Sequence, residues 1–164
     1  MAAPARSSSI RRGLVRFPYL KYPVRGVGAV FVTSVYRPTV PIRLFGPAGD
    51  GLAYGLVDTG ADDTILPDRF IKPLGVKIHP SDYANLAGID DLLVFVRFGT
   101  LDLELSRPGV AYRWSATVAF YPGSKAILGH SGFLEHFTAT FNGLRRHVTL
   151  TPNGTAPAAT APGR

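Results

Sequence analysis

Short apolar runs, several with the two-residue alternation of a half-buried β-strand, recur along the chain and are separated by Gly, Pro and Asp. The segment 46–51 is a strong turn signal, and Gly99-Thr100 is expected to form a tight hairpin turn. The pattern predicts strands at 27–36, 39–45, 52–57, 92–98, 101–105, 112–121, 138–141 and 147–150. It therefore favours an all-β fold.

Helical signals are few and short. A helical turn is predicted within 66–74, with Pro67 near its start and Gly75 after its end. A second helix-like segment at 131–137 follows the short apolar run at 126–129. The high counts of Gly (18) and Pro (14) also demand many turns and few long helices.

The composition, 46% hydrophobic and 18% charged, is that of a globular protein, and 164 residues suffice for one domain with a core. Because there is no cysteine, disulfides, thiolate nucleophiles and cysteine-ligated zinc are excluded. No apolar run approaches the roughly 18 residues that a membrane-spanning helix needs, and no secretory signal is recognised. We therefore expect a soluble, cytoplasmic protein.

The net charge of +7 is concentrated in the first part of the chain. The first 49 residues contain eight basic side chains and no acidic one, whereas the rest has ten basic against eleven acidic side chains. Three regions are expected: a basic, disordered arm at 1–25, a folded domain at 26–150 and an Ala- and Pro-rich disordered tail at 151–164. The arm is interpreted as a solvated extension; a nucleic-acid contact, an anionic-membrane contact and a transit peptide are the alternatives.

One segment combines an acidic side chain with a sharp turn directly after an apolar strand. The predicted strand at 52–57 runs into the sequence DTGADDT at 58–64. Gly60 lets the backbone turn sharply, so the carboxylate of Asp58 is displayed at a loop tip. The alternative is an ordinary strand-to-turn Asp that bonds its own backbone.

The segment 58–64 resembles the active-site loop of the retroviral-type aspartic proteases, the retropepsins, whose signature is an apolar pair followed by Asp-Thr-Gly-Ala. A second family element is a strand of two apolar residues and a Gly, which passes beside the catalytic loop and precedes a short helix. Ile127-Leu128-Gly129 and 131–137 are similar to it. With a looser match from 40 to 150, the resemblance implies a closed, mostly antiparallel acid-protease β fold with one short C-terminal helix.

The resemblance implies a specific chemistry for Asp58. Two such carboxylates lie roughly 3 Å apart and share one proton, so that one activates a water while the other acts as general acid. Because Asp-Thr-Gly occurs once, the second acid is expected to be Asp58 of another copy, on the two-fold axis of a homodimer. The implied activity is that of an aspartic endopeptidase on an extended peptide, with no metal or organic cofactor. The alternatives are a non-catalytic peptide-binding or dimerisation module and a dimeric platform whose arm binds nucleic acid.

The resemblance also assigns roles to the residues that follow Asp58. Thr59 would bond across the axis to the other copy, and Gly60 would offer backbone polar groups to the peptide. Asp62 and Asp63 would contact the peptide main chain, with a hydrated acidic turn as the alternative. Ala61 lacks the hydroxyl with which Ser or Thr of pepsin-like enzymes bonds the carboxylate, so we expect an activity optimum at mildly acidic to near-neutral pH.

Two further features correspond to the family less closely. The flap that closes over substrate is expected at 86–91, with Gly88 and Ile89 as substrate contacts and an ordinary exposed hairpin as the alternative. If the acids at 90 and 91 face the cleft, basic or neutral substrate residues would be preferred. His130 stands where many retropepsins have an Arg that pairs with the second acid, here Asp62, and a His could do so only when protonated or as a neutral donor.

Overall fold

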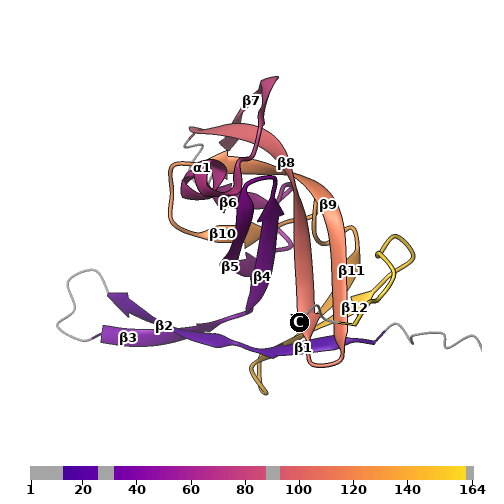
Figure 1. Cartoon of the computed structure of the whole chain (residues 1–164). Helices are drawn as coiled ribbons and strands as arrows, with labels where there is room; N and C mark the ends of the chain where they lie inside the picture. The colour runs from indigo at the N-terminus through magenta and orange to yellow at the C-terminus, as the bar shows by residue number, and fades with distance from the viewer. Residues whose placement is uncertain (1–12, 26–31, 88–92, 162–164) are drawn as a thin grey trace, which may run out of the picture.

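The computed structural model describes residues 13–25, 32–87 and 93–161, which form mostly β-structure with one short α-helix (Figure 1). The elements in chain order are β1 (Val15–Pro18), β2 (Leu20–Arg25), β3 (Val32–Arg37), β4 (Thr39–Gly46), β5 (Gly49–Val57), β6 (Ile65–Pro67), the 3-10 helix η1 (Asp68–Phe70), α1 (Ile71–Leu74), β7 (Ile78–Ala87), β8 (Leu93–Arg107), β9 (Val110–Tyr121), β10 (Ala126–Leu128), β11 (Phe137–Asn142) and β12 (His147–Pro152). The predicted mostly β fold class is therefore confirmed, as is the helical turn before Gly75. Within the described ranges, no helix is long and apolar enough to cross a membrane.

The largest sheet has seven strands in the order β4-β5-β10-β6-β9-β8-β7. An additional pairing of β4 with β8, in which Leu44 lies opposite Leu103, closes this sheet on itself. A three-stranded sheet, β1-β12-β11, contributes its buried side chains to the same core. The hairpin of β2 and β3 extends away from the body of the molecule (Figure 1).

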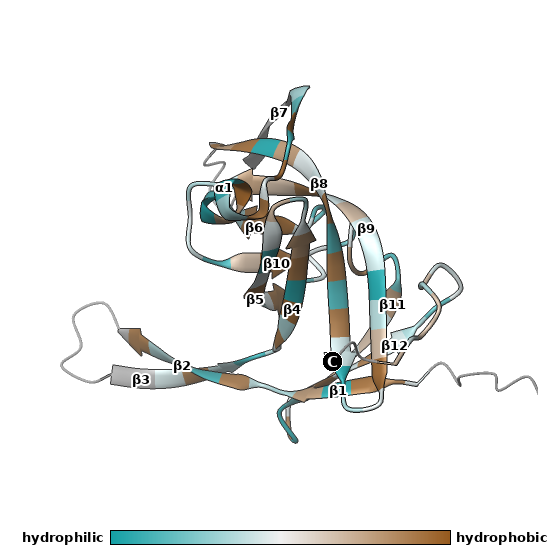
Figure 2. Cartoon of the chain, in the orientation of Figure 1, coloured by the Kyte–Doolittle hydropathy of each residue, from teal (hydrophilic) through white to brown (hydrophobic). Residues whose placement is uncertain are grey.

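The core fills the closed sheet because inward side chains alternate with outward ones along the long strands. In β9, Tyr112 and Trp114 are at most 7% exposed, whereas Arg113 between them faces outward. Figure 2 shows this alternation of apolar and polar residues along β8 and β9. The rings of Trp114, Phe133 and Phe137 lie with centroids 5.4 to 6.0 Å apart. Each fully buried side chain of this size contributes about 1.5–3 kcal/mol of hydrophobic stabilisation.

The strand β8 is continuous, so the predicted hairpin turn at Gly99-Thr100 was wrong. Gly99 instead marks a close approach to the chain before β7: a Cβ atom there would lie 2.7 Å from Cγ1 of Val76 and 3.0 Å from the carbonyl oxygen of Lys77. The turn that joins β8 to β9 comes later and contains Gly109, whose φ of +87° favours glycine.

Ordered structure begins before residue 26, so the predicted disordered arm at 1–25 was wrong over its described part. The strand β1 pairs with β12 and buries Val15 and Phe17, and β2 pairs with β3. The alternation Val15-Arg16-Phe17 was the available signal, and the prolines and basic residues around it obscured it.

The C-terminal segment is likewise structured as far as residue 161, in contrast to the predicted disordered tail at 151–164. Ala156 and Ala159 are buried. The amide and the carbonyl group of Thr160 each form a 2.8 Å hydrogen bond with the backbone of Ala111 in β9. Small side chains suit this position, because the backbone of the segment lies directly against a strand.

The helix expected at 131–137 is a run of turns instead. Gly132 has a φ of +84°, outside the helical region, so a regular helix cannot pass through it. The amide of His136 donates a hydrogen bond to the carbonyl oxygen of Phe133, and the amide of Glu135 donates one to the carbonyl oxygen of His130. The short helix of this fold therefore lies at α1 and not near the C-terminus.

Candidate functional site

The loop that carries Asp58 is anchored at both ends to β10. The preceding strand β5 pairs in parallel with β10, and the following strand β6 pairs with the opposite edge of β10. The amide of Asp58 donates a 3.1 Å hydrogen bond to the carbonyl oxygen of Leu128, the last residue of β10. The prediction that the apolar run at 126–129 passes beside this loop is confirmed.

The carboxylate of Asp58 is held by a turn within the loop. Its Oδ1 atom accepts a 2.9 Å hydrogen bond from the amide of Gly60, and its carbonyl oxygen accepts a 3.4 Å bond from the amide of Ala61. Asp58 is half-buried, whereas Thr59 and Gly60 are exposed. One carboxylate oxygen is therefore oriented while the side chain stays accessible at the surface.

Two consecutive amides in the chain that follows β10 brace the middle of the loop. The amide of His130 donates to the carbonyl oxygen of Ala61 at 2.9 Å, and that of Ser131 donates to the carbonyl oxygen of Asp62 at 2.7 Å. These bonds tie the loop to the chain that leaves β10, so the position of Asp58 is set by two segments that are far apart in sequence.

Gly129 allows this close approach. A Cβ atom at Gly129 would lie 2.3 Å from the carbonyl oxygen of Asp63 and 2.7 Å from that of Ala61, which is closer than real Cβ contacts come. The glycine is needed because both neighbours are backbone atoms, which cannot rotate away as a side chain can.

The ring of His130 contacts the loop at a different residue from the one expected. Its Nε2 atom lies 3.0 Å from the carbonyl oxygen of Thr59. Because a carbonyl oxygen can only accept, Nε2 must carry the proton in this bond. Within the described part of the chain His130 forms no ion pair with Asp62, so it does not take the place of the Arg that pairs with this acid in many retropepsins. His130 nevertheless supports the same loop, and it can do so in its neutral form, because an imidazole protonated at Nε2 alone makes this bond.

Replacing His130 by Ala should destabilise the fold by about 1 kcal/mol, because the bond to the Thr59 carbonyl is lost. The amides of Gly60 and Ala61 should exchange with solvent faster, as the loop loses a contact on one side. Thermal unfolding and amide hydrogen exchange measure the two effects. His130→Gln, which keeps a side-chain N–H donor, should be milder; equal effects of Ala and Gln would contradict a role for this hydrogen bond.

The two acids after Ala61 differ in their surroundings. Asp62 is exposed and Asp63 is half-buried. Burial raises the pKa of the Asp63 carboxyl, and the negative charge of Asp62 adds to this rise. Neither side chain has an ion-pair partner among the described residues, and no group of three His, Asp or Glu residues in these ranges is placed to hold a metal ion.

Asp63→Asn should raise the free energy of unfolding at pH 7 by about 0.5 kcal/mol, since it removes a charge that the folded state disfavours. A raised pKa in the folded state means that ionisation of Asp63 weakens the fold as the pH rises. The gain should therefore shrink as the pH falls through the raised pKa of the folded state, and vanish below about pH 4, where the carboxyl is protonated in both states. Urea unfolding of both proteins at pH 7 and below about pH 4 measures this difference in the free energy of unfolding. Asp102→Asn should instead lower stability at pH 7, because Asp102 pairs with Arg113 at 3.1 Å.

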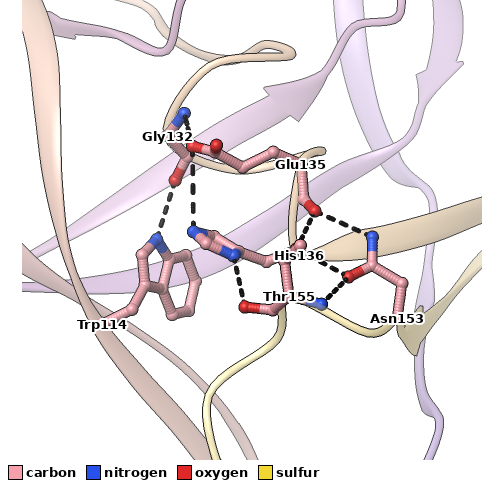
Figure 3. Close-up of polar contacts among 6 residues, drawn as sticks. All are labelled: Trp114, Gly132, Glu135, His136, Asn153 and Thr155. Atoms are coloured by element: carbon pink, nitrogen blue, oxygen red, sulfur yellow. Dashed lines mark hydrogen bonds and ion pairs between the residues drawn. The ribbon is translucent and has the colours of Figure 1, made fainter.

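The turns that follow this brace are held by the C-terminal segment and by β9 (Figure 3). The indole nitrogen of Trp114 donates a buried 2.8 Å bond to the carbonyl oxygen of Gly132, whose amide donates to Oε1 of Glu135 at 2.6 Å. The carbonyl oxygen of Glu135 accepts bonds from the side chains of Asn153 and Thr155. Residues that the sequence placed in a disordered tail thus support the segment behind the Asp58 loop.

A groove of about 750 Å³ is lined in part by β5 and β10, the two strands that lead into the Asp58 loop and its brace. Leu56 of β5 and Ile127 of β10, which are paired in register, form part of its lining. These two residues lie within two positions of Asp58 and Gly129 respectively. The groove was not foreseen from the sequence, because its lining comes from segments between residues 20 and 127.

The predicted flap contacts Gly88 and Ile89 lie outside the described residues. The strands on either side of them, β7 and β8, form an antiparallel pair in which Ala87 lies opposite Leu93. A hairpin is therefore present at the expected distance after Asp58.

Comparisons with known proteins find similar solved structures but no matching family. No protein-family model matches the chain, and no curated protein matches it. The structure of EIAV protease complexed with the inhibitor HBY-793 aligns with a TM-score of 0.39 and 18% sequence identity, over 57% of this chain and 82% of that chain. This similarity is too low to assign a function to the chain, so the geometry around Asp58 has to carry the functional proposal.

Proposed function

We propose that the chain is an aspartic endopeptidase whose active site forms when two copies bring their Asp58 side chains together. The observation that carries the proposal is the arrangement of Asp58-Thr59-Gly60. This triplet follows the end of β5, one carboxylate oxygen is oriented by the amide of Gly60, and the side chain is accessible. An oriented carboxylate at a braced surface loop suits a symmetric dyad, in which each copy supplies one acid.

In the proposed mechanism the two carboxyl groups share one proton, because two negative charges so close together repel strongly. The ionised group takes a proton from a water whose oxygen attacks the peptide carbonyl carbon, and the protonated group gives its proton to the carbonyl oxygen. The tetrahedral intermediate then breaks its C–N bond. The nitrogen receives a proton from the dyad while one hydroxyl of the intermediate returns one, so the dyad ends with a single proton.

The neighbouring residues are proposed to serve this chemistry. Thr59 would brace the two loops across the dimer axis, and Gly60 would expose backbone groups to the bound peptide. Asp62 and Asp63 have no ion-pair partner among the described residues, which leaves their carboxylates free to accept hydrogen bonds from the peptide main chain. Ala61 offers no hydroxyl to Asp58, which supports an optimum at mildly acidic to near-neutral pH.

Hydrolysis of casein by the wild-type protein between pH 4 and 8, with and without pepstatin, tests the proposal. We expect cleavage that pepstatin inhibits and whose specific activity falls on dilution, because the site requires two copies. Absence of cleavage at high protein concentration would contradict the proposal and favour a non-catalytic peptide-binding module. A pH maximum below about 3 would contradict the role given to Ala61.

A further inference from the structure

The charged side chains that line the groove of β5 and β10 all have the same sign. Its lining contains four basic side chains and no acidic one: Lys21, Arg37, Arg69 and Lys125. Lys21 and Lys125 are exposed, on β2 and just before β10. Four cations around one concave surface create a positive potential that attracts anionic groups.

None of these cations is neutralised by a carboxylate in the described ranges. Arg69 donates a 3.4 Å hydrogen bond to the carbonyl oxygen of Ser124, and the guanidinium of Arg37 lies 5.7 Å from the ring centre of Tyr22. Both contacts position the cation and leave its charge uncompensated. Two arginines elsewhere on the surface, Arg43 and Arg113, are by contrast paired with acids.

The floor of the groove is apolar. Leu52 and Tyr54, on the outer face of β5, are 50% and 54% exposed, and both line the groove. Leu56 and Ile127 continue this apolar floor toward Asp58. Such a surface suits apolar side chains of a bound partner, while the basic rim suits acidic ones.

We propose that this groove binds an extended polypeptide segment that carries acidic side chains beside apolar ones. The segment is the part of a substrate that flanks the bond to be cut, so the assignment rests on the proposed function and adds a substrate class to it. An acidic side chain contacts Lys21 and Lys125, while a neighbouring apolar side chain covers Leu52 and Tyr54.

A nucleic acid also carries negative charge, but the observations favour a polypeptide. The lining of the groove reaches Leu56, two residues before Asp58 and the acidic loop that also carries Asp62 and Asp63. A strand with a phosphate at every nucleotide would be repelled by these carboxylates if it continued past Leu56. A peptide can place its acidic residues over the basic rim alone.

Equilibrium binding to the Asp58→Asn protein tests the proposal without cleavage. The probes are three fluorescein-labelled peptides with a central Leu-Phe pair and Glu, Gln or Lys at the same flanking positions, followed by fluorescence anisotropy. The Glu peptide should bind about tenfold more tightly than the Gln peptide, and the Lys peptide should bind most weakly. Adding Lys21→Glu and Lys125→Glu to the Asp58→Asn protein should remove the preference for Glu.

The matched control carries Lys77→Glu and Arg145→Glu, two exposed cations outside the groove, and changes the net charge equally. It should keep the preference. Equal binding of the three peptides, no binding of any of them, or equal losses in the two double variants would overturn the proposal. Tighter binding of an oligothymidine than of the Glu peptide would overturn it in favour of nucleic acid. Casein hydrolysis by the wild type reports separately on the proposed function, so either can fail alone.

Discussion

Replacing Asp58 by Asn should reduce casein hydrolysis about a hundredfold to ten-thousandfold, the typical range for loss of a general acid or base. The amide of Asn cannot take a proton from water or donate one to the substrate as a carboxyl group does. The fold should persist, because the Asn oxygen can still accept the hydrogen bond from the amide of Gly60. Cleavage rates of the wild-type and Asp58→Asn proteins measure the loss of activity, and their thermal unfolding measures whether the fold persists.

The same variant tests whether two copies form the site. Mixing wild-type protein with a tenfold excess of the Asp58→Asn protein should lower wild-type activity about tenfold, because most wild-type chains then pair with an inactive copy. An equal excess of an unrelated protein should have no such effect. Undiminished activity in the mixture would contradict a shared site, and equal activity of the two proteins alone would identify the hydrolysis as that of a contaminant.

Gly129→Ala should lower the stability of the fold far more than His130→Ala. Its Cβ atom would lie 2.3 Å from the carbonyl oxygen of Asp63, so the backbone of the loop or of β10 must move. We expect a loss of about 3 kcal/mol in the free energy of unfolding, at the upper end of overpacking effects. For a chain of this size that corresponds to a drop of roughly 6–12 °C in the unfolding temperature. Casein hydrolysis should fall as well, because the displaced loop carries Asp58.

A glycine without neighbours provides the control for this substitution. A Cβ atom at Gly143, in the turn between β11 and β12, would meet nothing within 4 Å. Gly143→Ala should therefore leave the unfolding temperature almost unchanged. The fluorescence of Trp114, the single tryptophan, follows unfolding in both variants from a buried position next to Gly132. Similar stability of the two variants would contradict the close approach at Gly129.

Much of the strand pattern could be predicted from neighbouring residues in the sequence. The strand before Asp58, the turn after β4 and the apolar run of β10 lie where the alternation and the turn residues placed them. The errors have a common cause. Gly99 resembled a turn residue but is a packing site, and Val15 and Phe17 resembled part of an unstructured arm but are buried by β12. In each case the deciding partner is distant in sequence.

The candidate site shows the same division. The triplet at Asp58 and its local turn were predictable, because a short-range bond from Gly60 to the carboxylate forms it. The contact of His130 with Thr59 in place of Asp62 was not, because it depends on how β10 leads into the loop. The acids at 90 and 91, which suggested basic or neutral substrate residues, lie outside the described residues. The proposed preference for acidic substrate residues rests instead on the basic side chains that line the groove.

The sequence by itself determined the mostly β fold class and the display of a carboxylate at the end of β5, because side-chain alternation and backbone turning are properties of adjacent residues. Only the tertiary structure decided the closure of the sheet, the need for glycine at 129 and the basic groove. These depend on distances between segments, such as β5, β10 and the hairpin of β2 and β3, that come together only when the chain folds.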